Sequence, residues 1–238
     1  LNILSRNAGT VKIFGLDNIV DEQAIKQKIG TVFDEVFFVE SWTVSEVGKI
    51  LSRFYEQWNK DLFRGYIVNF ELPLDRKVKE LSRGMKMKLM LAVALSHEAE
   101  LLIFDEPTSG LDPVARDELL TIMNDYISDG ERSILFSTHI TSDLEEIADY
   151  ITLIDNGNIF YSGTKSGLFE SYVIVKGSLD DLTATLKKSM ITTMRNKEEF
   201  SGLLPVSDSM NVPERITIER PTIDSILVLI SKGGKADA

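Results

Sequence analysis

Short apolar runs and amphipathic segments alternate along the chain. Ile29–Phe33 and Leu101–Phe104 are short apolar runs, as expected of parallel strands that are covered on both faces. Val114–Ser128 carries apolar residues at helical spacing and leads to a further strand, Ser133–Ser137. This alternation of strand, helix and strand predicts an α/β core with a parallel sheet.

Between the first two strands the apolar period changes to that of a helix. Thr43 and Glu46 have the spacing of a capping box, and apolar residues then recur at helical spacing: Val47, Ile50, Leu51, Phe54, Tyr55 and Trp58. A second helix ends near Pro73. The pattern predicts a helical subdomain, at about residues 41–97, inserted in the α/β core.

The last third of the chain has a different organisation. Asn156-Gly157 joins two short apolar runs and predicts a β-hairpin. From about Ser171 strand-like alternation and short helices restart, and we interpret residues 166–238 as a small C-terminal α+β accessory region beside a first domain of residues 1–165. The tail from Gly233 is predicted to be disordered.

Composition limits the class of protein. The chain has 238 residues, 43% of them hydrophobic, with a net charge of −11 and no cysteine. Disulfides and thiolate metal sites are excluded, and the acidic balance argues against a nucleic-acid partner, which needs clustered Lys and Arg. Apolar runs all fall short of the roughly 20 residues that span a bilayer, so we expect a soluble intracellular chain.

Residues 81–113 contain the most informative motifs. LSRGM (81–85) opens a helix, the apolar strand after it ends in Asp105-Glu106, and Ser109-Gly110-Leu111-Asp112 follows. The order and spacing resemble the ATP-binding cassette (ABC) family, with its LSGGQ signature, Walker B strand and D-loop. The resemblance implies a P-loop NTPase-like cassette fold, ATP and Mg²⁺ as ligands, and ATP hydrolysis coupled to transport.

Carboxylates at the end of a buried strand are costly to desolvate unless a cation or donor compensates them. By resemblance, Asp105 holds Mg²⁺, Glu106 polarises the attacking water, and His139 contacts the γ-phosphate. Taken alone, Asp105-Glu106 can equally be a solvated turn, and a lone histidine is more often structural. His97 lies near a helix end, and we expect it to contact only the helix terminus.

Three further motif residues have a structural and a functional interpretation. Ser82 and Gly84 stand where the family contacts ATP held by the opposite subunit, although Ser82 can simply cap a helix. Arg83 replaces the first glycine of LSGGQ and can add a cation near the phosphates, whereas Met85 replaces its glutamine and cannot hydrogen-bond in the same way. Asp112 matches the D-loop residue that links two nucleotide sites and can also cap the next helix.

Asp34 stands at the position of the family's Q-loop glutamine. Its carboxylate can face Mg²⁺ or the attacking water, or it can cap a loop, and the residues favour neither alternative. The aromatic residues nearby belong mostly to the core. In the family the adjacent groove receives a cytoplasmic helix of the membrane permease, so we expect some of these aromatics to form a docking surface.

The phosphate-binding motif G-x-x-x-x-G-K-[ST] does not occur in these 238 residues, whose two Gly-Lys pairs are Gly48-Lys49 and Gly234-Lys235. The first residues, LNILSRNAGTVKIFG, match the end of the family's P-loop helix and the following strand. We therefore expect a cassette core truncated at its N-terminus, with the preceding strands and Walker A loop removed or never present.

Three functions are compared. The first is the ATP-binding and ATP-hydrolysing subunit of a bacterial ABC exporter, which dimerises with a second ATPase subunit, drives a separate permease and lies on the cytoplasmic face of the membrane. The second is a catalytically incompetent cassette fragment that acts as an interaction or regulatory module. The third, a DNA-handling ABC ATPase, is disfavoured by the acidic balance. Without Walker A, we expect this polypeptide alone to be a very weak ATPase.

Overall fold

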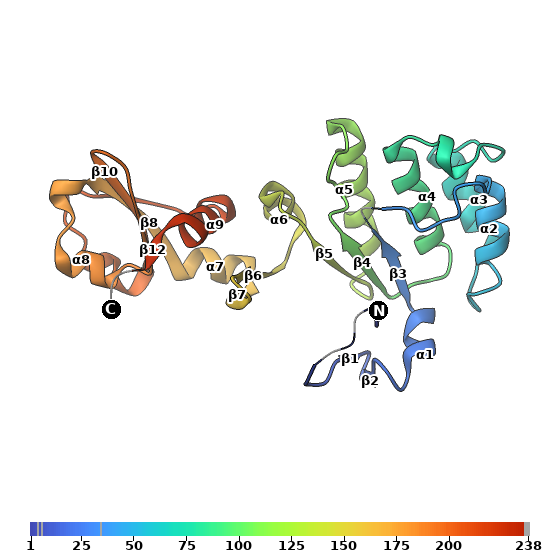
Figure 1. Ribbon diagram of the computed structural model, residues 1–238, viewed down its shortest axis with the longest axis horizontal. Coiled ribbons are helices and arrows are strands. Elements are labelled where there is room, and N and C mark those ends of the chain that lie inside the picture. The colour runs from blue at the N-terminus through green and yellow to red at the C-terminus, as the bar shows by residue number, and fades with distance from the viewer. Residues whose placement is uncertain (4, 6, 34, 236–238) are drawn as a thin grey trace. The chain divides into compact units, whose positions relative to one another are not determined.

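The computed structural model describes residues 1–3, 5, 7–33 and 35–235, and every structural statement below concerns this part of the chain. It divides into two compact units, Leu1–His139 and Ile140–Ala238. Figure 1 shows the elements of each unit in chain order. This division falls earlier than the domain boundary near residue 165 that the sequence suggested, and the latter stays a prediction.

The first unit contains a three-stranded parallel sheet. Its strands are β3 (Ile29–Val32), β4 (Leu101–Asp105) and β5 (Ser133–Ser137), in the order β3-β4-β5. In the register Gly30 lies beside Leu102, which lies beside Ile134. The predicted parallel α/β core is confirmed.

β5 is an edge strand of this sheet. Its residues alternate between exposed and half-buried, and Leu135 is 62% exposed. An edge strand presents backbone N–H and C=O groups that are able to pair with another strand.

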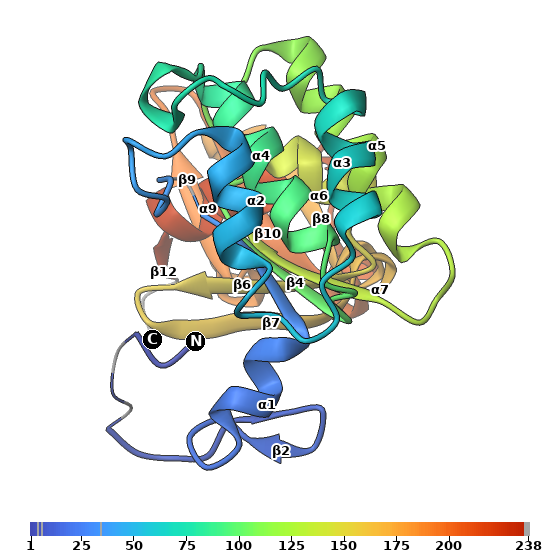
Figure 2. The ribbon, with the colours of Figure 1, turned by 90° about the vertical axis from the view of Figure 1, so that its right-hand side faces the viewer.

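Helices α4 (Arg83–Leu95) and α5 (Pro113–Ile127) pack against the sheet, α4 on β3 and α5 on β5. α2 (Val44–Leu51) and α3 (Lys60–Asn69) pack against α4, as Figure 2 shows, and a 3₁₀ turn, Val78–Glu80, precedes α4. The C-terminal half of α4, Leu89–Leu95, is buried because it is enclosed by β3 on one side and by the helices on the other. These helices form the subdomain that the apolar spacing predicted.

The capping box at the start of α2 is present, but the helix is shorter than predicted. Glu46 N donates to Thr43 Oγ1 at 3.2 Å, and Thr43 N donates to Glu46 Oε2 at 2.8 Å. α2 ends at Leu51, and turns follow, so the continuation of this helix to Trp58 was wrong. Trp58 instead packs on Phe63 of α3, with ring centroids 5.3 Å apart. Apolar spacing alone does not distinguish a helix from turns that bury the same side chains.

The N-terminal segment forms a small hairpin and one short helix. β1 (Lys12–Ile13) pairs antiparallel with β2 (Leu16–Asp17), and α1 (Glu22–Gln27) leads into β3. Phe14 and Gly15 join the strands with φ values of 55° and 78°. Two residues with positive φ make the turn that matches the twist of a hairpin, so the strand expected in the first residues is limited to Lys12–Ile13.

Gly30 allows α4 to approach β3 closely. A Cβ built on Gly30 would lie 2.5 Å from Leu102 Cδ2 and 2.9 Å from Ala94 Cβ. We expect Gly30→Ala to lower the free energy of unfolding by about 1–3 kcal/mol through overpacking. In the control Gly65→Ala, the added Cβ meets no atom within 4 Å, and the exposed helical site should gain about 0.5–1 kcal/mol. Urea denaturation followed by circular dichroism measures both, and equal effects would contradict the expected close contact.

The second unit is an α+β structure. Its segment up to residue 171 contains α6 (Thr141–Ile147), the hairpin β6 (Tyr150–Asp155) and β7 (Asn158–Thr164), and α7 (Lys165–Ser171). A five-stranded antiparallel sheet follows, in the order β11-β8-β10-β9-β12. Its strands are β8 (Tyr172–Ser178), β9 (Thr192–Arg195), β10 (Glu199–Pro205), β11 (Thr217–Glu219) and β12 (Gly234–Lys235). The helical elements of this part are α8 (Ala184–Ser189), α9 (Ile223–Lys232) and the 3₁₀ segments Leu179–Asp181 and Val206–Asn211.

One hydrophobic cluster joins the β6–β7 hairpin to the C-terminal sheet. It contains Ile151 and Leu153 of the hairpin, Leu168 of α7, Leu203 of β10 and three residues of α9. A second cluster, around Phe200 and Leu204, includes Leu186 of α8. The shared core explains why the compact unit begins before the hairpin.

The end of the chain is ordered further than predicted. β12 pairs antiparallel with β9, with Gly234 opposite Thr193 and Lys235 opposite Thr192. The prediction of disorder from Gly233 was therefore wrong for residues 233–235, while residues 236–238 lie outside the described part. Backbone pairing supplies order here that a Gly- and Lys-rich sequence does not signal.

No helix in the described part of the chain combines the length and the apolar character that crossing a membrane requires.

Candidate nucleotide site

Four polar residues lie together at the carboxyl ends of β4 and β5: Asp105, Glu106, Ser137 and His139. Asp105 ends β4 and lies beside Ser137, which ends β5. Ser137 Oγ donates to Asp105 Oδ1 at 2.5 Å, and Glu106 N donates to Ser137 O at 2.9 Å. Parallel strands end at the same edge of a sheet, so adjacent strand ends place these groups side by side. Ser137 was not singled out from the sequence, because its role depends on the register between β4 and β5.

Glu106 and His139 form a direct pair beside them. His139 Nδ1 lies 2.7 Å from Glu106 Oε2, and His139 N donates to the same oxygen at 3.3 Å. The Glu106 side chain is 29% exposed, so the carboxylate is partly sheltered and still reachable by water. Glu106 also has a φ of 49°, a left-handed conformation that costs free energy for a residue with a Cβ.

The Ser82 hydroxyl caps α4. Ser82 Oγ accepts a hydrogen bond from Met85 N at 3.2 Å, and Ser82 is exposed. The capping interpretation is therefore confirmed, while the ligand role of Ser82 stays a prediction. A Cβ built on Gly84 would meet no atom within 4 Å, so internal packing does not require a glycine there. Open space at a helix N-terminus is what a bound anion needs.

Asp112 caps α5. Asp112 Oδ1 accepts from Val114 N at 3.0 Å and from Ala115 N at 3.1 Å, with Pro113 at the first helical position. The cap is confirmed, and the predicted role of Asp112 between two nucleotide sites stays a prediction. Two residues before it, Gly110 adopts a φ of 67°.

Asp34 lies outside the described residues, and its predicted role at the Q-loop position stays a prediction. On either side of it, the rings of Phe33 and Phe37 meet edge to face at 5.0 Å. Phe37 is 73% exposed and Phe54 is 65% exposed, whereas Trp42 and Trp58 are half-buried. The structure thus separates exposed aromatics from core aromatics, which the sequence left open.

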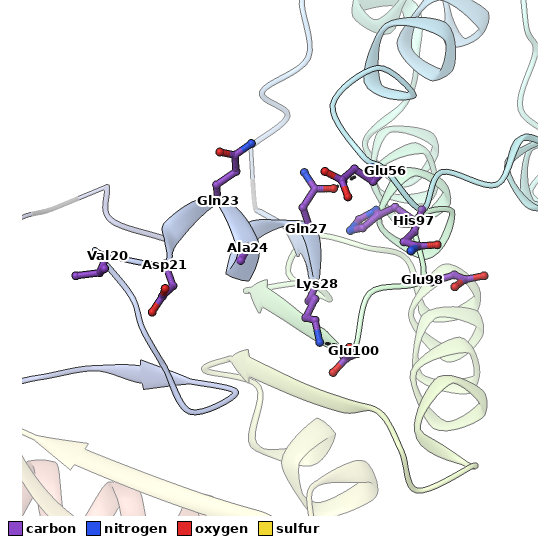
Figure 3. Close-up of a pocket in the computed structure, with 11 residues that line it drawn as sticks. Val20, Asp21, Gln23, Ala24, Gln27, Lys28, Glu56, His97, Glu98 and Glu100 are labelled. Atoms are coloured by element: carbon purple, nitrogen blue, oxygen red, sulfur yellow. Dashed lines mark hydrogen bonds and ion pairs between the residues drawn. The ribbon is translucent and has the colours of Figure 1, made fainter.

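A cavity of about 760 Å³ lies at the opposite ends of the strands, where Lys28 precedes β3 and Glu100 precedes β4 (Figure 3). Lys28 Nζ pairs with Glu100 Oε1 at 2.8 Å. The other charged residues that line the cavity are Asp21, Glu56 and Glu98. This acidic lining repels a triphosphate, so the cavity is unsuited to ATP despite its size.

His97 lies at the base of this cavity and bridges α4 and β3 (Figure 3). The residue is 1% exposed, and its Nδ1 and Nε2 each lie 3.1 Å from a carbonyl oxygen, of Val93 and Ile29 respectively. Its ring stacks on Tyr55 at 3.8 Å. The expected contact with the helix end is present, but the expectation that His97 contacts only the helix terminus was wrong, because its Nε2 also contacts β3.

Burial lowers the pKa of His97, against the opposing effect of the two carbonyl contacts. In the unfolded chain this histidine titrates near its ordinary pKa of about 6.5. As the pH falls through that value, the unfolded state binds the proton first, so we expect the free energy of unfolding to decrease. Above it both states are neutral, and the contribution of His97 to stability is complete.

Urea unfolding at a series of pH values from about 7.5 to about 5.5 measures this decrease in the free energy of unfolding. His97→Gln should reduce this dependence of the free energy of unfolding on pH. An unchanged dependence in His97→Gln would contradict the prediction.

Comparisons with known proteins agree with this geometry. A family profile described as "ABC transporter" matches residues 1–109. The ABC transporter ATP-binding protein YtrB of Bacillus subtilis (strain 168) is 26% identical over 208 residues, covering 87% of this chain and 71% of the relative. The bacitracin transport ATP-binding protein BcrA of Enterococcus faecalis is 31% identical over 153 residues, covering 63% of this chain and 50% of the relative.

A solved structure described as "Structure of ATP binding subunit of ABC transporter" is 26% identical with a TM-score of 0.62, and the alignment covers 68% of this chain and 69% of that one. Residues 1–109 of the chain belong to the ABC transporter family. Members of this ABC family are ATPases coupled to transport. The cassette fold expected from the motifs is confirmed.

The ABC motifs occupy defined places in the first unit. The signature segment forms the N-terminus of α4, the Walker B residues end β4, and the D-loop connects β4 to α5. Sequence reasoning missed one relation among them, the contact between Arg83 of the signature segment and Gly110 of the D-loop. No signal in the sequence reports it, because the contact depends on the turn that Gly110 makes.

Proposed function

We propose that the chain is the ATP-hydrolysing subunit of a bacterial ABC exporter and that it drives a separate membrane permease. The observation that carries the proposal is the pairing of Glu106 with His139 directly beside Asp105 and Ser137. Export is supported by relatives named for bacitracin transport, lantibiotic transport and Nod factor export.

The donor set at the strand ends suits Mg²⁺ in part. Mg²⁺ is usually held by one or two carboxylates, waters and substrate phosphates. Asp105 supplies one carboxylate, and Ser137 orients it through the hydroxyl contact at 2.5 Å. Within the described part of the chain, no cluster of three His, Cys, Asp or Glu residues can hold a metal alone. Asp105 would thus hold the ion together with phosphate oxygens of ATP, and the bound Mg-ATP would supply the phosphoryl group that water attacks.

Glu106 is suited to take a proton from that water. Within the described part of the chain, both contacts of its carboxylate fall on Oε2, which leaves Oε1 to accept the proton. His139 holds the carboxylate in one orientation through two hydrogen bonds, from Nδ1 and from its backbone N–H. A fixed base within reach of water is the requirement for general base catalysis.

Partners follow from the remaining surfaces. Ser82 and Gly84 at the N-terminus of α4 would contact ATP held by a second ATPase subunit, and Asp112 would lie at the same interface. The exposed rings of Phe37 and Phe54 would contact the permease, on the cytoplasmic face of the membrane. Transport then follows from association and separation of the two ATPase subunits during hydrolysis.

The test of this proposal is ATP hydrolysis in proteoliposomes that contain the permease and the subunit, with the coding frame continued upstream of Leu1. We expect Mg²⁺-dependent hydrolysis that rises when an amphiphilic peptide substrate is added. A rate of ATP hydrolysis that changes neither with the permease nor with the peptide would contradict the export proposal. Salt-sensitive DNA binding would favour a DNA-handling ATPase instead.

A second function applies to the 238-residue polypeptide by itself. It contains no G-x-x-x-x-G-K-[ST] motif, whose N–H groups and Lys provide much of the grip on ATP phosphates. An interaction or regulatory module is therefore the alternative function for a polypeptide of this extent. Binding of ATP distinguishes the two functions.

A further inference from the structure

Arg83 lies across the D-loop of its own chain. A Cβ built on Gly110 would lie 2.9 Å from both Cζ and Nη1 of Arg83 and 3.2 Å from its Nε. Three atoms of one guanidinium group at nearly equal distances show that the flat face of the group covers Gly110. Arg83, which replaces the first glycine of LSGGQ, thus places its guanidinium group against Gly110 of the D-loop.

The D-loop connects this contact to Glu106 through two tight turns. Leu111 N donates to Thr108 O at 3.2 Å, and Ser109 N donates to Glu106 O at 3.1 Å. Gly110 and Glu106 both have positive φ, at 67° and 49°. A backbone with two left-handed residues and short-range hydrogen bonds persists only when its surroundings hold it in place.

Contacts between α4 and α5 also hold the D-loop in place. Lys88 Nζ pairs with Glu118 Oε2 at 2.6 Å across the two helices. Leu111 lines, with Gly84 and Met87, a void of only about 10 Å³. A void of this size barely holds one water molecule, so the base of the D-loop is tightly packed. Arg83 adds a further contact, to Gly110.

We propose that Arg83 is a positioning residue that holds the D-loop turn and, through it, the backbone of Glu106. The inference rests on the proposed role of Glu106 in hydrolysis. A planar guanidinium presents a flat face to Gly110, whereas the ammonium group of Lys is a compact charge that cannot. The signature segment and the D-loop of one subunit would therefore move as one body when they meet the partner subunit.

The first test needs no nucleotide. In Arg83→Gly, we expect the amides of Ser109, Gly110 and Leu111 to exchange hydrogen about tenfold faster than in the wild type. Arg83→Lys should show the same direction, and the control Lys86→Gln should leave the exchange unchanged. The β6–β7 turn at Asn156-Gly157 serves as an internal reference. Equal exchange in Arg83→Gly and the wild type would overturn the inference, whatever the result for hydrolysis.

The second test separates positioning from contact with ATP. In the assembled transporter, Arg83→Gly and Arg83→Lys should lower kcat about tenfold, with KM for ATP changed by less than about twofold. A raised KM with an unchanged kcat would overturn the inference and favour direct contact of Arg83 with phosphate. If the wild-type transporter fails to hydrolyse ATP, the proposed function fails, and the exchange experiment still decides whether Arg83 holds the D-loop.

Discussion

Glu106→Gln is expected to lower ATP turnover by the assembled transporter by about 10²–10⁴-fold, the usual contribution of a general base. The amide keeps the size of the carboxylate and can still accept from the His139 backbone N–H, which lies 3.3 Å from Oε2. It cannot take a proton from water. Because the substitution removes the base and leaves the phosphate contacts intact, we expect the affinity for ATP to change little. Single-turnover hydrolysis and equilibrium binding of labelled ATP measure the two quantities.

Glu98→Gln is the matched control. Glu98 is exposed and has a φ of 53°, close to the 49° of Glu106, so the same chemical change is made on a similar backbone. It lines the acidic cavity at the opposite ends of the strands. We expect full turnover in this variant. Turnover by Glu106→Gln within about threefold of the wild type would remove Glu106 from the role of base.

Mg-ATP is expected to bind the 238-residue polypeptide at least about 100-fold more weakly than a version continued upstream through the coding frame, a difference of about 2.7 kcal/mol or more. The described contacts supply Asp105 for the cation and the N-terminus of α4 for an anion, but the sequence holds no phosphate-cradling loop with its Lys. Isothermal titration calorimetry of both polypeptides under the same conditions measures the difference.

A useful control in this titration is Mg²⁺ without nucleotide, which should give no heat beyond dilution in either polypeptide. If both polypeptides bind Mg-ATP alike, another part of the chain holds the phosphates, and the exposed N-terminus of α4 at Ser82 is the first place to examine. If only the longer version binds, the ATPase function belongs to it, and the shorter polypeptide is limited to interaction or regulation.

The site was predictable where strand order decides it. Asp105 and His139 follow neighbouring parallel strands, so their proximity follows from the α/β pattern alone. The orientation of each group was not predictable. Ser137 contacts Asp105 because of the β4–β5 register, and Glu106 reaches His139 through a left-handed φ that no residue type signals.

The orientation of the Arg83 side chain was also not predictable from the sequence. The sequence suggested a cation near the phosphates, which stays a prediction, and the structure adds that the guanidinium group lies against Gly110. The direction of a long side chain at a helix start depends on the space that neighbouring loops leave. That space becomes visible only when the backbone of the D-loop is known.

The fold was predictable in its periodic parts and less so in the second unit. β3, β4 and α5 match the predicted segments closely, because apolar periods continue over whole elements. β9 and β10 were not predicted, and β12 was taken for a disordered tail. These strands are specified by pairing with partners distant in sequence, which a local pattern does not contain.

Within the described part of the chain, β5 has a neighbouring strand, β4, on one side only, which makes this polypeptide a candidate for a split-protein reporter. A peptide strand supplied from outside could hydrogen-bond along Ser133–Ser137 and cover Leu135, which is 62% exposed. If such a peptide were fused to one protein and this chain to a second, association of the two proteins would produce a measurable gain of sheet structure. A lysine at position 135 would weaken the same edge, and thereby give the reporter its background control.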